Sequence, residues 1–227
     1  MSEAPPSPAP LAPWRRHLRA RVLHAGNRVF CRGYHRLDVS GQNRVPRTGR
    51  AILVCNHISG LDPLLIQSAV GPRLVVWMMA KEYHEIRSIA WVFHAVDAIP
   101  VARSGRDTAA TRAALRALNE DRVLGIFPEG KIETSRALLP FQPGVAQLAI
   151  RTGAPVFPAY IEGTNRGMEM IPAFVNANRV RLRFGPPVEF DRTDTDRDRL
   201  EAAAEAIRQA VARLRDQDLR QHPRATG

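Results

Sequence analysis

The chain has 227 residues, of which 44% are hydrophobic, and its 33 Lys and Arg against 22 Asp and Glu give a formal net charge of +11. This length fits one domain with a sizeable core. Two cysteines argue against a disulfide framework and for a reducing compartment. No stretch reaches the ~20 apolar residues of a bilayer span, and the first residues lack the pattern of a signal peptide. We therefore expect a cytoplasmic protein that meets a membrane only at its surface.

The excess positive charge is concentrated near the N-terminus. Residues 1–50 contain ten Arg against Glu3 and Asp38, a net charge of +8, whereas residues 51–190 contain fifteen basic and twelve acidic residues. A basic segment of this kind can bind nucleic acid, an acidic protein or an anionic membrane.

The N-terminal segment predicts a disordered tail followed by a basic helix. Residues 1–13 contain five prolines and should be disordered. Over residues 14–35, apolar residues recur at intervals of three or four, which predicts an amphipathic helix. Its apolar stripe consists of Leu11, Trp14, Leu18, Val22, Ala25 and Val29. Two interpretations that do not exclude each other stay open: a helix lying in a membrane interface, or a helix packed on the domain with a solvated basic face.

From residue 36 onward, short apolar runs alternate with helical patterns. We expect strands at RLDVSG, AILVCN, RLVVWMMAK, DAIPVA, RVLGIF, APVFPAYI and NRVRLRFG, the last nearer an edge. We expect helices at residues 64–70, 84–96, 108–121, 143–152 and 195–218, the first capped by Asp62 with Pro63 at its first position. The alternation predicts an α/β fold over residues 36–218: a single domain with a mixed, largely parallel sheet flanked by helices. Residues 219–227 should be a flexible C-terminus.

Four stretches lie where predicted strands end, which is where open α/β sheets place their sites. In the first, NHISGLD, His57 follows a strand and Asp62 begins a helix. A turn can bring the carboxylate onto the imidazole, fix its tautomer and leave the other ring nitrogen free as a base. Alternatively, Asp62 only caps the helix and His57 is an ordinary loop residue. The stretch alone does not decide between these interpretations.

The other three stretches are less specific by themselves. DAIPVA leads to Arg103 and Arg106, whose guanidinium groups suit phosphate oxygens, although a pair of surface arginines is the alternative. FPEG, residues 127–130, predicts a tight turn with backbone N–H groups free to face an anion, or a plain turn. Pro158 interrupts an apolar strand, which predicts a bend or an edge position.

Taken in order, the four stretches resemble the glycerolipid acyltransferases, which include the 1-acylglycerol-3-phosphate acyltransferases. The resemblance covers about residues 36–190. It implies that His57 is the catalytic base, that Asp62 is its partner and that Arg103 binds the phosphate of the acyl acceptor. It also implies that the FPEG turn binds the acceptor, with the following lysine in support; these residues are Phe127, Pro128, Glu129, Gly130 and Lys131.

The resemblance implies acyl transfer from a thioester, acyl-CoA or acyl carrier protein, to the hydroxyl of a lysophospholipid, with 1-acylglycerol-3-phosphate as the first candidate. His57 would remove the hydroxyl proton during the attack, help that is typically worth roughly 10²–10⁴ in rate. No nucleophilic Ser or Cys, metal or organic cofactor is required, and Cys55 is expected in the core. We expect the protein on the cytoplasmic face of an anionic membrane.

Two departures from the family pattern leave the acceptor open. Lys131, Ile132 and Glu133 follow FPEG where members often have Thr-Arg-Ser, and Ala98 stands where the second motif usually begins with glycine. Another lysolipid, such as a lyso-aminolipid, is therefore the alternative acceptor. A basic nucleic-acid-binding or membrane-surface protein without catalysis would explain the charge but neither FPEG nor NH-x4-D. Since the body lacks aromatic residues interleaved with basic ones, we expect no nucleic-acid partner.

Overall fold

One seven-stranded sheet forms the centre of the protein. The computed structural model describes residues 13–41, 45–71, 73–85, 96–102, 107–192 and 196–223, with the backbone alone for residues 13–21, 84 and 85. The strands are β1 (Asp38–Ser40), β2 (Ala51–Cys55), β3 (Val75–Ala80), β4 (Ile99–Val101), β5 (Val123–Ile126), β6 (Val156–Glu162) and β7 (Arg181–Phe184). Their order in the sheet is β1-β7-β6-β2-β5-β3-β4. Neighbouring strands pair in parallel except β6 and β7, which are antiparallel. The predicted α/β domain with a mixed, largely parallel sheet is confirmed.

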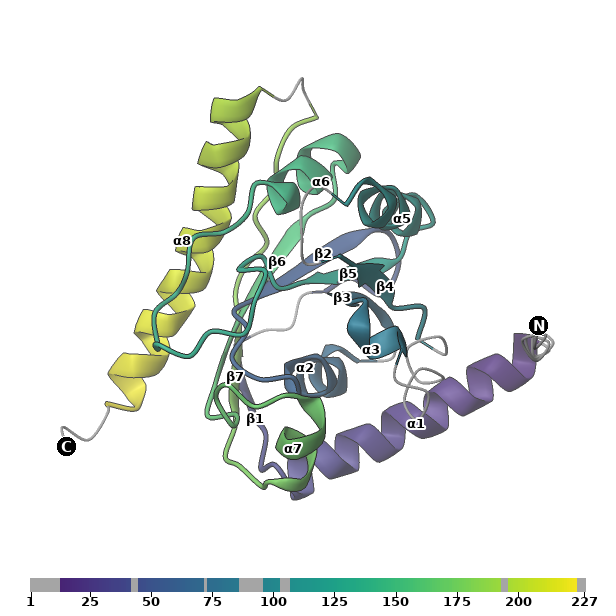
Figure 1. The fold of residues 1–227 in the computed structure, drawn as a ribbon, viewed down its shortest axis with the longest axis vertical. Helices are drawn as coiled ribbons and strands as arrows, with labels where there is room; N and C mark the ends of the chain where they lie inside the picture. Colours follow the sequence, from purple (N-terminus) through teal and green to yellow (C-terminus); the bar gives the residue numbers. More distant parts are fainter. Residues whose placement is uncertain are drawn as a thin grey trace, which may run out of the picture.

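Helices cover both faces of this sheet (Figure 1). They are α1 (Pro13–Gly33), α2 (Asp62–Val70), α3 (Glu82–Glu85), α5 (Thr108–Asn119), α6 (Gly144–Thr152), α7 (Met170–Val175) and α8 (Arg197–Gln221). One apolar core joins the sheet to α5, α6 and α8, and the other joins it to α1, α2 and α7. Because both faces are covered, β2 is buried at every residue, as its uninterrupted apolar sequence predicts.

The topology gathers several strand ends at one edge of the sheet. β2 lies between β5 and β6 and is parallel to both, so the three strands end at the same edge. The loops that follow them begin at Asn56, Phe127 and Gly163, and these loops supply the candidate site. β4 is parallel to its neighbour β3 and ends at this edge as well.

Several sequence predictions differ from the structure. The short helix α7 was not expected. Helix α3 overlaps the start of the helix predicted at 84–96, most of which lies outside the described residues. Pro158 is not on an edge strand, because β6 lies inside the sheet. It falls between the isolated bridge of Val156 with Val188 and the start of the β6–β7 ladder at Ala159, so its missing N–H costs no ladder hydrogen bond with β7.

Helix α1 packs on the domain with the face opposite its apolar stripe. Asn27 donates to the carbonyl oxygen of Leu64 at 2.8 Å, and Cys31 is fully buried. Val22 and Val29 of the stripe are 63% and 75% exposed. At ~100° per residue, these valines project about 180° away from the packing face. None of the helices in the described ranges is long and apolar enough to cross a membrane.

Candidate active site

The loop after β2 folds His57 and Asp62 together. Nδ1 of His57 lies 3.0 Å from Oδ2 of Asp62. The same carboxylate oxygen accepts the backbone N–H groups of Ile58 at 2.7 Å and Ser59 at 2.9 Å. Asp62 is fully buried, whereas the side chain of His57 keeps 17% of its surface exposed. Its Nε2 has no hydrogen-bond partner in the part of the chain that the structure describes, so it is available to a bound molecule.

The predicted cap at Asp62 is wrong. An N-cap side chain accepts an N–H from two or three residues further along the chain, but Asp62 accepts from Ile58 and Ser59, which precede it. The position before the first helical residue is occupied by Leu61, and no side chain caps the helix there. The carboxylate therefore holds the loop and the imidazole rather than the end of α2.

An aromatic stack fixes the plane of the imidazole. The ring of His57 lies on that of Phe127, with centroids 4.1 Å apart and planes 15° from parallel, and Phe127 lies in turn on Trp77 at 5.0 Å. Gly125 makes room for this stack, because a Cβ there would stand 2.5 Å from the indole of Trp77. Phe127, predicted to bind the acceptor, thus contacts His57 directly.

Glu129 is buried behind His57 and binds its backbone. Oε1 of Glu129 accepts the N–H of His57 at 3.2 Å, and Oε2 accepts that of Leu139 at 3.3 Å. Burial raises the pKa of Glu129 from its ordinary value of 4.5 to about 7, against the lowering effect of these two N–H donors. The side chain is 6% exposed. In the described structure Glu129 therefore holds the backbone of His57 from the buried side and does not line an open surface.

The turn of the FPEG motif differs from the prediction in one respect. Gly130 has φ +72°, a conformation that favours glycine, but its N–H donates to the carbonyl oxygen of Phe127 at 3.1 Å. This N–H is therefore used within the turn and is not free for an anion. Pro128 is buried, while Lys131 is exposed directly after the turn.

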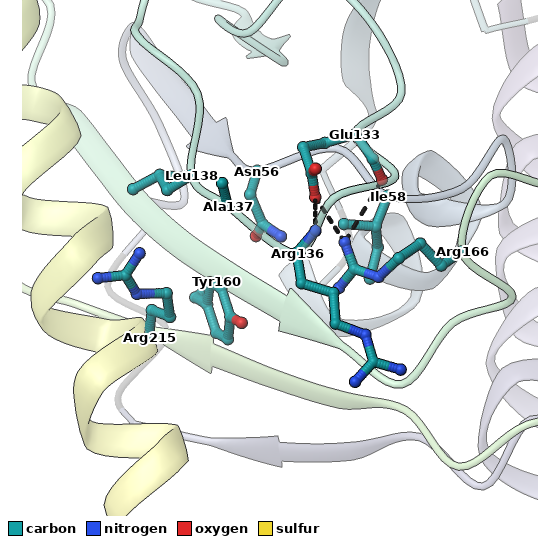
Figure 2. Close-up of a pocket in the computed structure, with 9 residues that line it drawn as sticks. All are labelled: Asn56, Ile58, Glu133, Arg136, Ala137, Leu138, Tyr160, Arg166 and Arg215. Atoms are coloured by element: carbon teal, nitrogen blue, oxygen red, sulfur yellow. Dashed lines mark hydrogen bonds and ion pairs between the residues drawn. The ribbon is translucent and has the colours of Figure 1, made fainter. Parts of the chain in front are cut away.

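The loop after FPEG closes on the other side of His57 through Glu133. Its N–H donates to the carbonyl oxygen of His57 at 2.7 Å. Its carboxylate, 2% exposed, accepts the N–H groups of Ser135 and Arg136 and pairs with Arg166 at 2.7 Å. Burial acts to raise the pKa of Glu133, but these partners together hold it below its ordinary value. Figure 2 shows the backbone nitrogen of Arg136 and the guanidinium of Arg166 at this carboxylate, while the guanidinium of Arg136 points away from it.

A small pocket adjoins this Glu133–Arg166 pair (Figure 2). Two of its three arginines are paired within the protein, Arg166 also with Glu162 and Arg215 with Asp216. The guanidinium of Arg136, which also lines the pocket, is exposed and pairs with no carboxylate among the described residues.

Asn56 is a structural residue of the site that the sequence reasoning missed. Its amide donates to the carbonyl oxygen of Ile161 at 2.9 Å and accepts the N–H of Ile161 at 2.8 Å. It thereby ties the end of β2 to β6 directly before His57. The signal was present in the Asn-His pair at a strand end, since a buried amide there can extend the hydrogen bonding of a strand.

Two further expectations concern Arg103 and Cys55. Arg103 lies outside the described residues, although β4 ends at Val101 on the edge of the sheet that carries His57. Cys55 is fully buried, and burial raises the pKa of its thiol well above the ordinary value, which makes it an inert core residue.

The described site thus combines a supported imidazole–carboxylate pair with an open Nε2, which suits removal of a proton from a bound hydroxyl.

The family of the chain follows from comparison with known proteins. The family model described as Acyltransferase matches residues 36–162, which is more than half of the chain and includes the loops carrying His57 and FPEG. The protein therefore belongs to the acyltransferase family and is an enzyme of that class.

Individual proteins are similar to the chain at sequence identities between 21% and 29%. It is 24% identical over 181 residues to the 1-acyl-sn-glycerol-3-phosphate acyltransferase of Bacillus subtilis, covering 78% of this chain and 87% of the relative. It is 29% identical over 135 residues to the enzyme of the same name from Borreliella burgdorferi, covering 57% of this chain and 52% of the relative. The crystal structure of the LPA acyltransferase PlsC from Thermotoga maritima shares the fold, with a TM-score of 0.69, 21% identity, and coverage of 93% and 83%.

Proposed function

We propose that the protein transfers a fatty acyl group from a thioester to the hydroxyl of a lysophospholipid. The observation that carries this proposal is the pairing of His57 Nδ1 with the buried carboxylate of Asp62 at 3.0 Å, which leaves Nε2 open. A carboxylate on one ring nitrogen fixes the tautomer in which the other nitrogen accepts a proton.

In the proposed mechanism, Nε2 of His57 takes the proton of the acceptor hydroxyl as its oxygen attacks the thioester carbonyl. Asp62 then stabilises the imidazolium without itself taking the proton. Collapse of the tetrahedral intermediate breaks the carbon–sulfur bond, and the thiolate leaves with the proton that His57 gives back. The base moves little during these steps, because Glu129 and Glu133 bind the N–H and the carbonyl of His57.

For the acceptor we propose 1-acylglycerol-3-phosphate, with phosphatidic acid as the product. The relatives from Bacillus subtilis and Borreliella burgdorferi carry this activity in their names. Arg103, by the family resemblance, and Lys131, by its exposure beside the turn, are the proposed partners of the phosphate. Either acyl-CoA or acyl carrier protein supplies the acyl group, and we expect no metal or organic cofactor. A lyso-aminolipid is the alternative acceptor, because the residues after FPEG depart from the family pattern.

We further propose that α1 holds the enzyme on the cytoplasmic face of an anionic membrane. The helix presents Val22 and Val29 outward, and the exposed Arg32 lies nearer to this outer side than to the packing face by the helical period. An apolar stripe beside arginines suits a helix lying in the lipid interface.

The test is an acyl-transfer assay with purified full-length protein, labelled acyl-CoA or acyl carrier protein, and a panel of lysolipids. We expect transfer to 1-acylglycerol-3-phosphate and at least tenfold less to lysolipids without a terminal phosphate. Transfer to a lyso-aminolipid alone would replace the acceptor but keep the chemistry. No transfer from either donor to any acceptor would overturn the proposed reaction.

A further inference from the structure

Among the described residues, the exposed large apolar side chains all lie on or beside two elements, α1 and α7. They are between 38% and 75% exposed. They are Val22, Leu23, Val29 and Tyr34 on and just after α1, and Met168, Ile171, Phe174 and Val175 on and just before α7. Single exposed apolar residues are ordinary on a protein surface, but a concentration of this kind indicates a contact surface.

The two elements form one continuous surface. Phe30 of α1 stacks on Phe174 of α7 with ring centroids 4.3 Å apart. The hydroxyl of Tyr34 donates to the carbonyl oxygen of Val175 at 2.6 Å. Figure 1 shows α7 beside the C-terminal end of α1. We call the exposed side chains at this junction the α1–α7 patch, which consists of Tyr34, Met168, Ile171, Phe174 and Val175.

Exposed arginines outnumber carboxylates around the α1–α7 patch, where Glu169, directly before α7, is an exposed carboxylate that accepts the hydroxyl of Tyr83. Arg32, Arg36 and Arg179 are exposed, and none of them pairs with a carboxylate in the described ranges. Residues 171–178 carry no charged side chain. An apolar surface with unpaired arginines at its margin complements an anionic phospholipid surface, whose headgroups attract arginine while apolar side chains enter the acyl boundary.

The patch is directly connected to the loop that carries His57. The carbonyl oxygen of Met168 accepts the N–H of Gly60 at 2.8 Å, and the N–H of Gly167 donates to the carbonyl oxygen of Ile58 at 2.8 Å. The loop that precedes α7 and carries Met168 is therefore hydrogen-bonded directly to the loop that carries the base.

We propose that the α1–α7 patch is a second lipid-contacting surface, which inserts into the interface of an anionic bilayer and sets the site against it. The inference goes beyond the attachment of α1, because α7 comes from a different part of the chain. It rests on the proposed function in one respect: a lysophospholipid acceptor is held in a bilayer. Its test measures lipid contact without using activity.

The first experiment is flotation of the full-length protein with vesicles of phosphatidylglycerol and phosphatidylcholine. We compare wild type with Ile171→Asp/Val175→Asp, whose side chains are 57% and 64% exposed. The matched control is Ala202→Asp/Gln217→Asp, which adds the same charge at exposed positions of α8 on the other face of the sheet. We expect the patch variant to lose at least tenfold in vesicle binding and the control less than twofold. The neutral variant Ile171→Ser/Val175→Ser should lose severalfold, since apolar contact is removed without added charge.

The second experiment reports insertion at one position. The two native cysteines, Cys31 and Cys55, are buried, so a thiol-reactive fluorophore should label an introduced cysteine selectively. We expect anionic vesicles to shield a label at Val175→Cys from an aqueous quencher, and to leave a label at Gln217→Cys accessible. Unfolding midpoints of all variants establish that they are folded.

Each outcome decides the inference. Equal vesicle binding by folded wild type and patch variants, or equal quenching at the two labels, would overturn it. A patch variant that binds vesicles normally but loses transfer only from acyl carrier protein would identify a protein-docking face instead and would also overturn it. Vesicle insertion in a protein that acylates no lysolipid would uphold the patch and refute the proposed reaction.

Discussion

The carboxylate of Asp62 binds the imidazole of His57 and the two backbone N–H groups that follow it through a single oxygen, Oδ2. Orientation of the base and the shape of its loop therefore depend on the same atom. Because of this coupling, His57→Ala, Asp62→Asn and Asp62→Ala should differ in their effects on transfer and on stability.

The first prediction concerns the chemistry of the pair. His57→Ala should reduce transfer by ~10³ with the fold retained. Asp62→Asn can keep an oxygen at the Oδ2 position but lacks the charge that stabilises the imidazolium, so we expect ~10²-fold loss of kcat with little change in unfolding. Asp62→Ala removes all three hydrogen bonds and should also cost ~3 kcal/mol of stability, more than the ~1 kcal/mol of a lost cap. Steady-state kinetics and urea unfolding measure both effects. A folded His57→Ala enzyme with more than a few per cent of activity would exclude the proposed base.

The second prediction concerns the pH dependence of stability through Glu129. Its pKa rises from 4.5 to about 7 in the folded protein, so the folded state binds this proton more tightly than the unfolded chain. The stabilising contribution is complete below pH 4.5 and is lost as the pH rises through about 7. Glu129→Gln, which does not ionise, should therefore gain stability relative to wild type between pH 5 and pH 8. Urea unfolding at several pH values tests this, with exposed Glu189→Gln as the control. Parallel curves for Glu129→Gln and wild type would contradict the raised pKa.

The third prediction concerns Glu133 as a positioning residue. Its backbone holds the carbonyl of His57, and its carboxylate holds the loop through Arg166. Glu133→Gln should lower kcat by about tenfold with KM nearly unchanged, because the substitution disturbs the base and not the substrate contacts. Glu205→Gln, which breaks the more exposed pair with Arg208 on α8, is the control and should leave kcat unchanged. A change in KM alone would instead make Glu133 part of the substrate surface.

The fourth prediction concerns the acceptor phosphate. Arg103→Ala should raise the KM for a phosphate-bearing acceptor by at least tenfold and change the KM for the thioester donor little, because a charge-assisted anchor contributes mainly to binding. Arg112→Ala, on an exposed helix face, serves as the control. Equal losses toward both substrates, or none toward the acceptor, would show that Arg103 does not bind this phosphate.

The fifth prediction concerns the outward face of α1. Removing residues 1–34 would also remove the buried Cys31 and the stacked Phe30, so Val22→Asp/Val29→Asp is the better variant. It should bind anionic vesicles at least tenfold more weakly than wild type, with unfolding unchanged. High salt should weaken the wild type in the same direction, and neutral vesicles should bind poorly. Sedimentation with vesicles measures this, and wild-type binding by the variant would assign α1 to packing alone.

The sequence by itself determined the architecture, and its motifs predict the chemistry-bearing residues. The apolar run Ala51–Cys55 reads as a buried strand because parallel strands are covered on both faces. NH-x4-D and FPEG follow β2 and β5, and the structure brings both loops to one edge of the sheet because the carboxyl ends of parallel strands share it.

Only the tertiary structure decided what the side chains in these loops contact. Asp62 reads as a helix cap from local sequence, but its carboxylate turns back to the loop, where three donors converge on it. In the sequence, Glu133 is only a departure from the residues that usually follow FPEG. Its carboxylate holds the loop through a pair with Arg166, 33 residues away. Periodicity showed that α1 has an apolar stripe, but it could not show which face packs on α2. Long-range contacts settle such choices, and a local pattern does not contain them.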